Sequence, residues 1–499
     1  MSQADFLSPL LQCWAEIRDL DSAAEILEWD QETQMPAKGQ EGRGKVLGTL
    51  AALRHEKLTA SAMQEALAQA DAGAEAGSEA EAHLREARRL VDRAVKTPAA
   101  LARELAEAKS AGLVAWQAAR KASDFSIFQP ALERLLDLRR RQASCVMPEG
   151  SAFDAMLDEF EPGAKQADLE PLFQELIGAL VPLIQTVAEG GQEIDLSPVQ
   201  GNFPPDRQLA FAKTLIERMG FDFEAGRLDL AAHPFCIGFH PGDVRLTWRY
   251  QEDDIRPALF GLLHEAGHGM YEQGLPAESR RLPIGNAVSL GVHESQSRLW
   301  ENRVGRGRSF WQWALPLYRQ AFPDKAGVEA ESMHRALHQV KPSLIRVEAD
   351  QVTYDLHIAV RFQIEKGLFE GDLEVADLPV AWNDLYEQIL GIRPSDDAHG
   401  VLQDIHWSMG MFGYFPTYSL GNLLQAQLYE SALADLPDLE LQLAQGEFSS
   451  LLDWLRRKVH RPASRYSVAE LVKQATGKAL GTEDYLRYIR GLVAETYRP

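Results

Sequence analysis

The feature that most constrains the fold is a helical pattern of apolar residues that fills almost the first half of the chain. From residue 1 to about 230 the sequence is rich in Ala, Leu, Glu, Gln, Arg and Lys, and residues 79–122 place apolar residues at steps of three and four. This spacing is typical of amphipathic α-helices. Pro and Gly beside polar residues interrupt the pattern, as in QMPAKGQEG and SPVQGNFPPD. We therefore expect long helices joined by short loops, and no fixed-period repeat is visible.

A different pattern begins near the middle of the chain. Between residues 243 and 250, polar residues alternate with the apolar residues Val244, Leu246, Trp248 and Tyr250. A period of two predicts a β-strand with one buried face. Residues 286–292, NAVSLGV, form a second, shorter strand candidate, and the helical texture returns after about residue 293. The sequence thus predicts a mostly α fold with a small sheet near its middle.

Length and composition exclude several classes of protein. The chain has 499 residues, of which 45% are hydrophobic and 25% charged, as in soluble globular proteins. Its formal net charge of −22 would repel a phosphate backbone, so we expect no nucleic-acid partner. The longest apolar candidate, residues 176–184, is short for a membrane helix and contains Pro182. We expect no membrane association.

The N-terminus and the cysteines bear on the cellular location. The first residues, MSQADFLSPLLQCWAEIRDL, lack both a basic segment and a small-residue cleavage site of the kind that signal peptides carry. The three cysteines, Cys13, Cys145 and Cys236, are widely spaced and form no Cys-x-x-Cys pair. This argues against a disulfide framework and against a thiolate zinc site. A cytoplasmic protein with free thiols is the expectation.

A metal-binding pattern occurs in residues 253–274, which should form one helix between Pro257 and Gly274. His264 and His268 are four residues apart, so both imidazoles lie on one helix face and reach one ion. Glu265 lies beside that ion without needing to bind it. This is the His-Glu-x-x-His arrangement of zinc proteases, in which the glutamate is the general base.

Two further observations concern the same helix. A second pair four residues apart, His334 and His338, is followed by Arg335 in place of a glutamate, and we interpret it as a solvated helix face. The zinc-type helix also contains Gly261, Gly267 and Gly269, each of which costs a helix about 1 kcal/mol relative to Ala. Close approach of a neighbouring helix that brings a third ligand would explain them, and so would tight core packing.

A catalytic zinc needs a third protein ligand. Glu294, which lies 26 residues after His268 and opens a predicted helix, is the preferred donor, and His293 is the competing one. Two histidines with one glutamate form a recurrent hydrolytic zinc set, and the helix that follows can fix the carboxylate.

Short sequence blocks follow one another in order along nearly the whole chain: WDQETQMP at 29–36, LDEFEPG at 157–163, HPF at 233–235, DVRLT at 243–247, HEAGH at 264–268, HES at 293–295, IRVEAD at 345–350 and GVLQDIHW at 400–407. In this series the chain resembles the carboxypeptidase Taq family of metallocarboxypeptidases.

The resemblance implies one metallocarboxypeptidase unit over residues 1–499. Its helical lobes, about 1–230 and 231–499, would surround a deep active-site groove with a small central sheet, as in neurolysin and angiotensin-converting enzyme. It also implies a homodimer that removes single amino acids from peptide C-termini with broad specificity. One divalent ion per chain is expected, with zinc first and cobalt as the alternative, since the ligand set accepts both.

The expected mechanism is metal-assisted hydrolysis with Glu265 as general base. Further donors should stabilise the tetrahedral oxygen, and by resemblance these are His406 and one of Tyr414 and Tyr418. Asp404 and Glu272 are candidate partners for the histidine ligands.

Two arginines are candidates for substrate binding. Arg346 resembles the family's arginine for the C-terminal carboxylate, which a guanidinium binds as a fork. Arg245, on the polar face of the predicted strand, either contacts substrate or forms a structural salt bridge. Two alternatives remain open: an endo-acting oligopeptidase with the same metal site, and a peptide-binding scaffold with a structural metal. The glutamate at 265 argues against the scaffold.

Overall fold

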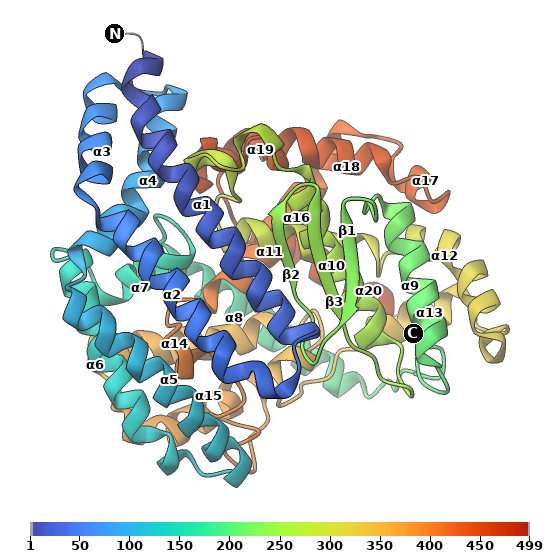
Figure 1. Cartoon of the computed structure of the whole chain (residues 1–499). Helices are drawn as coiled ribbons and strands as arrows, with labels where there is room; N and C mark the ends of the chain where they lie inside the picture. The colour runs from blue at the N-terminus through green and yellow to red at the C-terminus, as the bar shows by residue number, and fades with distance from the viewer. Residues whose placement is uncertain (1–2, 498–499) are drawn as a thin grey trace.

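A computed structural model describes residues 3–497, and the chain is mostly helical, as the sequence predicts (Figure 1). The helices before the first strand are long and separated by short loops. Their bounds are α1 (Gln3–Thr33), α2 (Gln40–Thr59), α3 (Ser61–Gly73), α4 (Glu79–Lys96), α5 (Ala99–Ala122), α6 (Gln129–Val146), α7 (Ala152–Phe160), α8 (Gln166–Gly190) and α9 (Pro205–Met219).

Helix α4 illustrates why these segments are helical. Ser78 caps its first turn by accepting a hydrogen bond from the Glu81 backbone N–H at 3.2 Å. Leu84, Ala87 and Val91 follow at helical spacing and are buried, while the charged residues between them are partly exposed. Most of the stability of such a helix comes from packing of its apolar stripe.

A three-stranded sheet follows, formed by β1 (Gly226–Leu230), β2 (Cys236–His240) and β3 (Asp243–Trp248). The strand order is β1-β3-β2, with β1 parallel and β2 antiparallel to β3.

The predicted strand is the central one, and Val244, Leu246 and Trp248 are buried as the alternation predicts. The alternation is wrong at its end, because Thr247 is also fully buried and Tyr250 lies beyond the strand and is 37% exposed. Strand β2 shows no period-two pattern in the sequence. Strand β1 alternates over residues 227–230 but lies in the segment that we expected to be helical.

The second strand candidate, residues 286–292, is wrong. The structure places a 3₁₀ turn at Pro283–Gly285 and starts α11 (Leu290–Arg298) within the candidate. The Ser289 hydroxyl accepts a hydrogen bond from the Val292 backbone N–H at 3.0 Å. This N-cap favours a helix where the apolar residues alone suggested a strand.

The remaining chain is helical. It begins with α10 (Arg256–Gly274), which fills most of the helix predicted at 253–274 and starts where Asp254 accepts from the Arg256 backbone N–H at 2.9 Å. After α11, a π-helical turn spans Leu299–Val304. The other helices are α12 (Arg308–Ala321), α13 (Ala330–Leu337), α14 (Tyr354–Glu370), α15 (Leu378–Leu390), α16 (Pro416–Asp435), α17 (Leu439–Ala444), α18 (Ser449–Leu455), α19 (Val468–Thr476) and α20 (Glu483–Thr496).

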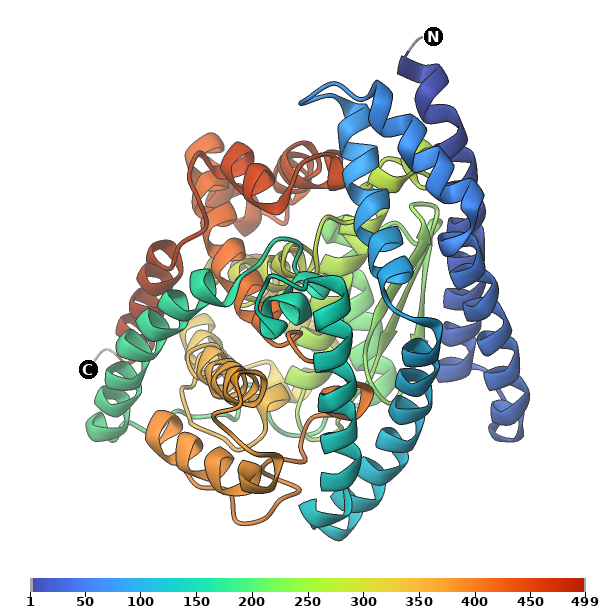
Figure 2. The same cartoon turned by 90° about the vertical axis from the view of Figure 1, so that its left-hand side faces the viewer.

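The sheet lies between α1 and α10 (Figures 1 and 2). On the α10 side, Gly269 packs so closely on Leu246 and Phe221 that a Cβ would lie 2.7 Å from the Phe221 ring. On the other side, the Trp29 ring of α1 lies under the guanidinium of Arg245, 4.3 Å from its carbon. The polar face of β3 is therefore covered by the N-terminal helix.

Two large hydrophobic cores hold the helices together. One surrounds the sheet, α10 and α12, and the other surrounds α14 and takes in α7 and α8. Each core contains residues from both sides of residue 230. In the first, the Phe211 and Tyr318 rings are 5.8 Å apart, and in the second the Phe153 and Phe362 rings are 5.7 Å apart. The lobe boundary near 230 and the deep groove stay predictions.

One described helix, α8, is long and apolar enough to cross a membrane by length and composition, with a mean hydropathy of 1.3 over its most apolar window. It contains Pro171 and Pro182, and five apolar side chains along one face are buried. Those residues belong to the core around α14, so α8 packs one face against the rest of the protein, with 22% of its apolar window buried.

Candidate metal centre

The two histidines of the predicted metal site lie on one face of α10. Their rings are 4.9 Å apart between centroids, and both side chains are mostly buried. The expected close approach of another helix is confirmed at Gly267, where a Cβ would lie 2.6 Å from the Ser297 Cα of α11. Gly261 has no comparable neighbour, since the nearest atom is 4.0 Å away.

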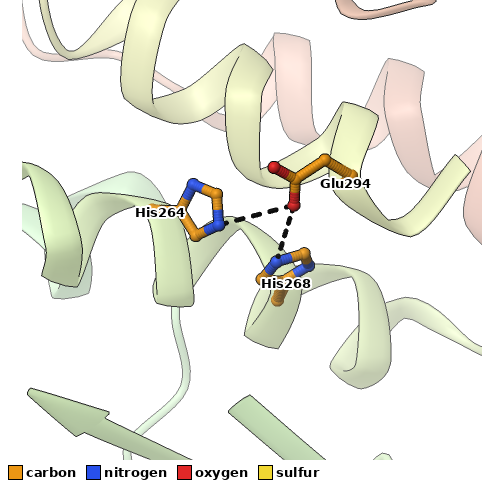
Figure 3. Close-up of side chains that lie close together, drawn as sticks. All are labelled: His264, His268 and Glu294. Carbon is orange, nitrogen blue, oxygen red and sulfur yellow. Dashed lines mark ion pairs between the residues drawn. The ribbon is translucent and has the colours of Figure 1, made fainter. Parts of the chain in front are cut away.

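Helix α11 brings Glu294 to the histidines (Figure 3). Its Oε2 lies 3.5 Å from Nε2 of His264 and 3.3 Å from Nε2 of His268. Ligand-type atoms of the three residues all lie within 4.8 Å of one another. Three donors from two helices thus converge on one point, with two imidazoles and one carboxylate, which is the donor set of hydrolytic zinc.

Helix α16 supports the carboxylate from behind. A Cβ on Gly421 would lie 2.6 Å from Cγ of Glu294, so only a glycine fits there. Glu294 is 6% exposed, and its position is therefore set by packing on both α10 and α16.

Two residues that we did not single out from the sequence complete this face of α11 and the turn after it. Arg298 donates from Nε to Oε1 of Glu294 at 2.7 Å, and Oε2 of Glu301 lies 2.9 Å from Nδ1 of His264. An ionised carboxylate can only accept, so Nδ1 of His264 carries the proton and Nε2 is free to bind an ion. The sequence contained a signal for Arg298 and Glu301, because residues 294, 298 and 301 share one helix face.

The field of these carboxylates favours a cation. Burial alone would lower the pKa of His264, but Glu294 and Glu301 raise it to about 10, so a bound cation would replace the proton that Nε2 holds in the metal-free protein. Burial opposes ionisation of Glu301 as well, yet Arg298 and His264 hold its pKa at about 2. Two ionised carboxylates beside two imidazoles fit a divalent cation, and the residues present suit the expected metal.

His293, the competing donor, contacts the second histidine instead of joining the cluster. Its Nδ1 lies 2.6 Å from Nδ1 of His268, and its Nε2 lies 3.0 Å from Oε1 of Glu272. The carboxylate of Glu272 accepts a hydrogen bond from Nε2–H of His293, so Nδ1 of the neutral His293 ring accepts a hydrogen bond from Nδ1–H of His268. Glu272 therefore acts on the ligand histidine His268 through His293. The sequence had suggested a direct contact between Glu272 and a ligand histidine.

Asp404, the other proposed partner of the ligands, is placed elsewhere. Its Oδ1 accepts from Nη2 of Arg346 at 2.9 Å and its Oδ2 from Nε of Arg361 at 2.7 Å. Burial disfavours the charge, but the two arginines hold the pKa of Asp404 well below its usual value. Asp404 thus fixes an arginine and not an imidazole.

Glu265, the proposed base, follows His264 on α10 and is 7% exposed. Burial raises its pKa to about 7, with the charge of His264 opposing the shift. A carboxylate with such a pKa can take and return a proton near neutral pH.

His406, the first residue of the 3₁₀ turn His406–Met409, forms an aromatic cluster with Tyr414 and Tyr418. Nε2 of His406 lies 3.3 Å from the Tyr418 hydroxyl, and the His406 and Tyr414 rings are 5.1 Å apart. Burial, and after it the charge of Glu294, raise the pKa of Tyr414 to about 12. The carboxylate of Glu294 is therefore close enough to act electrostatically on this cluster.

Arg346 is buried at the edge of this cluster. It donates from Nη1 to the Tyr354 hydroxyl at 2.9 Å, and its guanidinium lies 4.9 Å from the Tyr418 ring. The Tyr354 ring in turn lies 4.3 Å from the guanidinium of Arg298. Tyr354 therefore links Arg298, which holds Glu294, to Arg346, the candidate arginine for substrate binding.

Two candidates lie away from this arrangement. Arg245 is held by Asp243, at 2.9 Å from Nε, and lies between the rings of Trp29 and Phe239. These contacts favour its structural alternative. The interpretation of His334 and His338 as a solvated face is wrong, because they are 5% and 4% exposed. Helix α13 packs against α12, and its His face is the inner one.

Comparison with known proteins agrees with this geometry. The sequence model of the carboxypeptidase Taq (M32) metallopeptidase family matches residues 9–493. The chain is 43% identical to thermostable carboxypeptidase 1 of Thermus thermophilus over 98% of both chains, and 36% identical to carboxypeptidase 1 of Bacillus subtilis over 96% of both. Its fold matches the crystal structure of the M32 carboxypeptidase from Deinococcus radiodurans with a TM-score of 0.95 and 40% identity over 99% of each chain.

The fold and the site therefore define a helical metallopeptidase. The chain belongs to the carboxypeptidase Taq (M32) family, and it is a metal-dependent carboxypeptidase.

Proposed function

We propose that His264 and His268, through Nε2, and Glu294, through Oε2, hold one divalent ion, zinc first and cobalt as the alternative. The observation that carries this is the convergence of the three donor atoms within 4.8 Å. Glu301 and His293 keep the Nδ1 protons of the histidines away from the ion. The chemistry that the ion supplies when bound is polarisation of the scissile carbonyl and a lower pKa for water.

Glu265 acts as the general base on the attacking water and returns the proton to the leaving amine. Its pKa of about 7, raised by burial, suits both directions of transfer. The glutamate is the residue whose amide variant should keep the metal and lose turnover.

His406 and a neighbouring tyrosine donate hydrogen bonds to the oxygen that becomes negative in the transition state. Burial lowers the pKa of His406 to about 3, so the ring is neutral and one nitrogen is a donor. Among the described residues, its Nδ1 is buried with no hydrogen-bond partner. Burial also raises the pKa of Tyr418 well above its usual value, which keeps the phenol proton in place for donation.

Arg346 binds the free C-terminal carboxylate of the peptide. A guanidinium has five N–H groups, and Arg346 uses Nε and one each of Nη1 and Nη2 on Asp404 and Tyr354. One N–H on each Nη remains, which is the fork that a carboxylate needs. Such binding limits the enzyme to removal of single residues from C-termini, with broad side-chain tolerance.

The experiment that tests this is mass spectrometry of peptides with free and with amidated C-termini, incubated with the Zn²⁺-loaded or Co²⁺-loaded protein. Stepwise loss of single residues from the free acids only is the expected result. Internal cleavage of both peptide sets would favour the endo-acting oligopeptidase. Metal binding without cleavage of either set would favour the scaffold.

The cellular setting also remains a proposal. The acidic charge of −22 and the free cysteines support a cytoplasmic enzyme that acts on peptides and not on nucleic acid. The homodimer rests on the family alone, and light scattering of the purified protein would measure it.

A further inference from the structure

A buried carboxylate from a distant part of the chain lies at the start of the helix that carries Glu294. Glu161 follows α7, belongs to the LDEFEPG block and is 6% exposed. Its Oε2 accepts from the Gly291 backbone N–H at 2.9 Å, and the Ser289 hydroxyl donates to the same carboxylate. The carboxylate oxygen satisfies a backbone donor that the helix itself leaves unpaired.

The contact is tight enough to fix position. A Cβ on Gly291 would lie 2.6 Å from Oε2 of Glu161 and 3.3 Å from Cβ of Leu420. The first turn of α11 is thus held between the Glu161 carboxylate and α16. Because α11 is only nine residues long, a shift of its first turn moves Glu294 as well.

The same end of α7 also contacts the second part of the site. The Phe160 ring packs edge-on against Tyr414, with centroids 5.1 Å apart. Adjacent residues therefore contact the ligand helix and the aromatic cluster, and their backbone sets the distance between the two.

We propose that Glu161 is a positioning residue that fixes α11, and through it the metal ligand Glu294, relative to α7 and Tyr414. The inference rests on the proposed role of Glu294. Glu161 accepts from both the Gly291 N–H and the Ser289 hydroxyl. A glutamine has an NH₂ donor in place of one of the two carboxylate oxygens, so one of these contacts is weakened and the helix start can move from the position that Gly291 allows.

The test compares Glu161→Gln with Glu159→Gln. Glu159 lies on α7 and pairs with Arg93 and Arg139, without a contact to α11, so it is a matched structural control. Three quantities are measured: the Zn²⁺ dissociation constant by competition with a chromophoric chelator, kcat and KM on a short peptide, and the Tm of the metal-free protein.

We expect Glu161→Gln to raise the Zn²⁺ dissociation constant about tenfold and to lower kcat while KM changes little. Glu159→Gln should lower Tm and leave the Zn²⁺ constant and kcat at wild-type values. A Glu161→Gln protein that matches wild type in both the Zn²⁺ dissociation constant and kcat would overturn this inference and leave the proposed function standing. Wild-type protein that binds no Zn²⁺ would overturn the proposed function together with it.

If Glu161→Gln does not fold, Gly291→Ala gives the same test from the helix side. The added Cβ displaces the carboxylate, so the same weakening of Zn²⁺ binding is expected, and wild-type binding would overturn the inference.

Discussion

Arg298 holds one oxygen of Glu294 at 2.7 Å and leaves the other oxygen turned toward both ligand histidines. The carboxylate is thereby oriented to bind an ion through one oxygen. Arg298 also lies over the Tyr354 ring, and the Tyr354 hydroxyl accepts a hydrogen bond from Arg346. Arg298 and Tyr354 together therefore connect the metal ligands to Arg346.

Replacement of Arg298 should therefore weaken the metal site. We expect Arg298→Gln to raise the Zn²⁺ dissociation constant about 10- to 100-fold, because Glu294 loses the donor that orients it. Chelator competition measures this. Arg303→Gln, which removes an ion pair with Glu430 at 2.9 Å, is the control and should bind Zn²⁺ as wild type does.

The tautomer of His268 depends on a carboxylate that does not touch it. In Glu272→Gln the amide can donate to Nε2 of His293, which moves the His293 proton to Nδ1, opposite the Nδ1 proton of His268. Two donors then face each other, and we expect about tenfold weaker Zn²⁺ binding. Glu278→Gln, at an exposed position, should have no effect. Equal affinities would refute the proton arrangement.

Glycine 421 is expected to be irreplaceable. The Cβ of Gly421→Ala would overlap Cγ of Glu294, so the variant should lose about 1–3 kcal/mol of stability and much of its metal affinity. Gly491→Ala in α20 meets open space and should instead gain up to about 1 kcal/mol. Urea unfolding and Zn²⁺ titration of the two variants give the comparison.

Glu365 makes stability depend on pH. Burial raises its pKa to about 8, although Trp407 and the Gly413 backbone N–H both donate to it, at 2.8 and 2.9 Å. Between pH 4.5 and about 8, the folded protein therefore holds a proton on Glu365 that the unfolded chain, with the ordinary pKa of 4.5, has lost.

Its contribution to the free energy of unfolding is therefore largest below pH 4.5 and is lost as the pH rises toward 8. Relative to Glu365→Gln, metal-free wild type should lose up to about 1.4 kcal/mol per pH unit in this window. Urea unfolding at pH 5 to 8 measures the difference. The exposed Glu370→Gln on the same helix should run parallel to wild type, and a parallel Glu365→Gln curve would contradict the prediction.

The sequence predicted what depends on local spacing. The HEAGH helix, the central strand and the convergence of Glu294 follow from periodicity and from ligand chemistry, and Arg298 and Glu301 could have been found at four and seven residues from Glu294. Residues 286–292 were misassigned, because an apolar run does not reveal the Ser289 cap.

The rest of the site depends on packing between distant segments. Glu161 meets Gly291 across 130 residues, and Gly421 meets Glu294 only because α16 crosses α11. His334 and His338 have the same spacing as the metal pair, and only tertiary packing decides that they are buried. No local pattern carries such information.

The most direct measurement is metal stoichiometry and turnover of wild type and Glu265→Gln, each stripped and reloaded with Zn²⁺. One Zn²⁺ per chain in both proteins, with C-terminal trimming of a free-acid peptide reduced by several orders of magnitude in the variant, is the result that we predict. A Glu265→Gln protein that binds one Zn²⁺ and trims at the wild-type rate would contradict the role of Glu265 as the base.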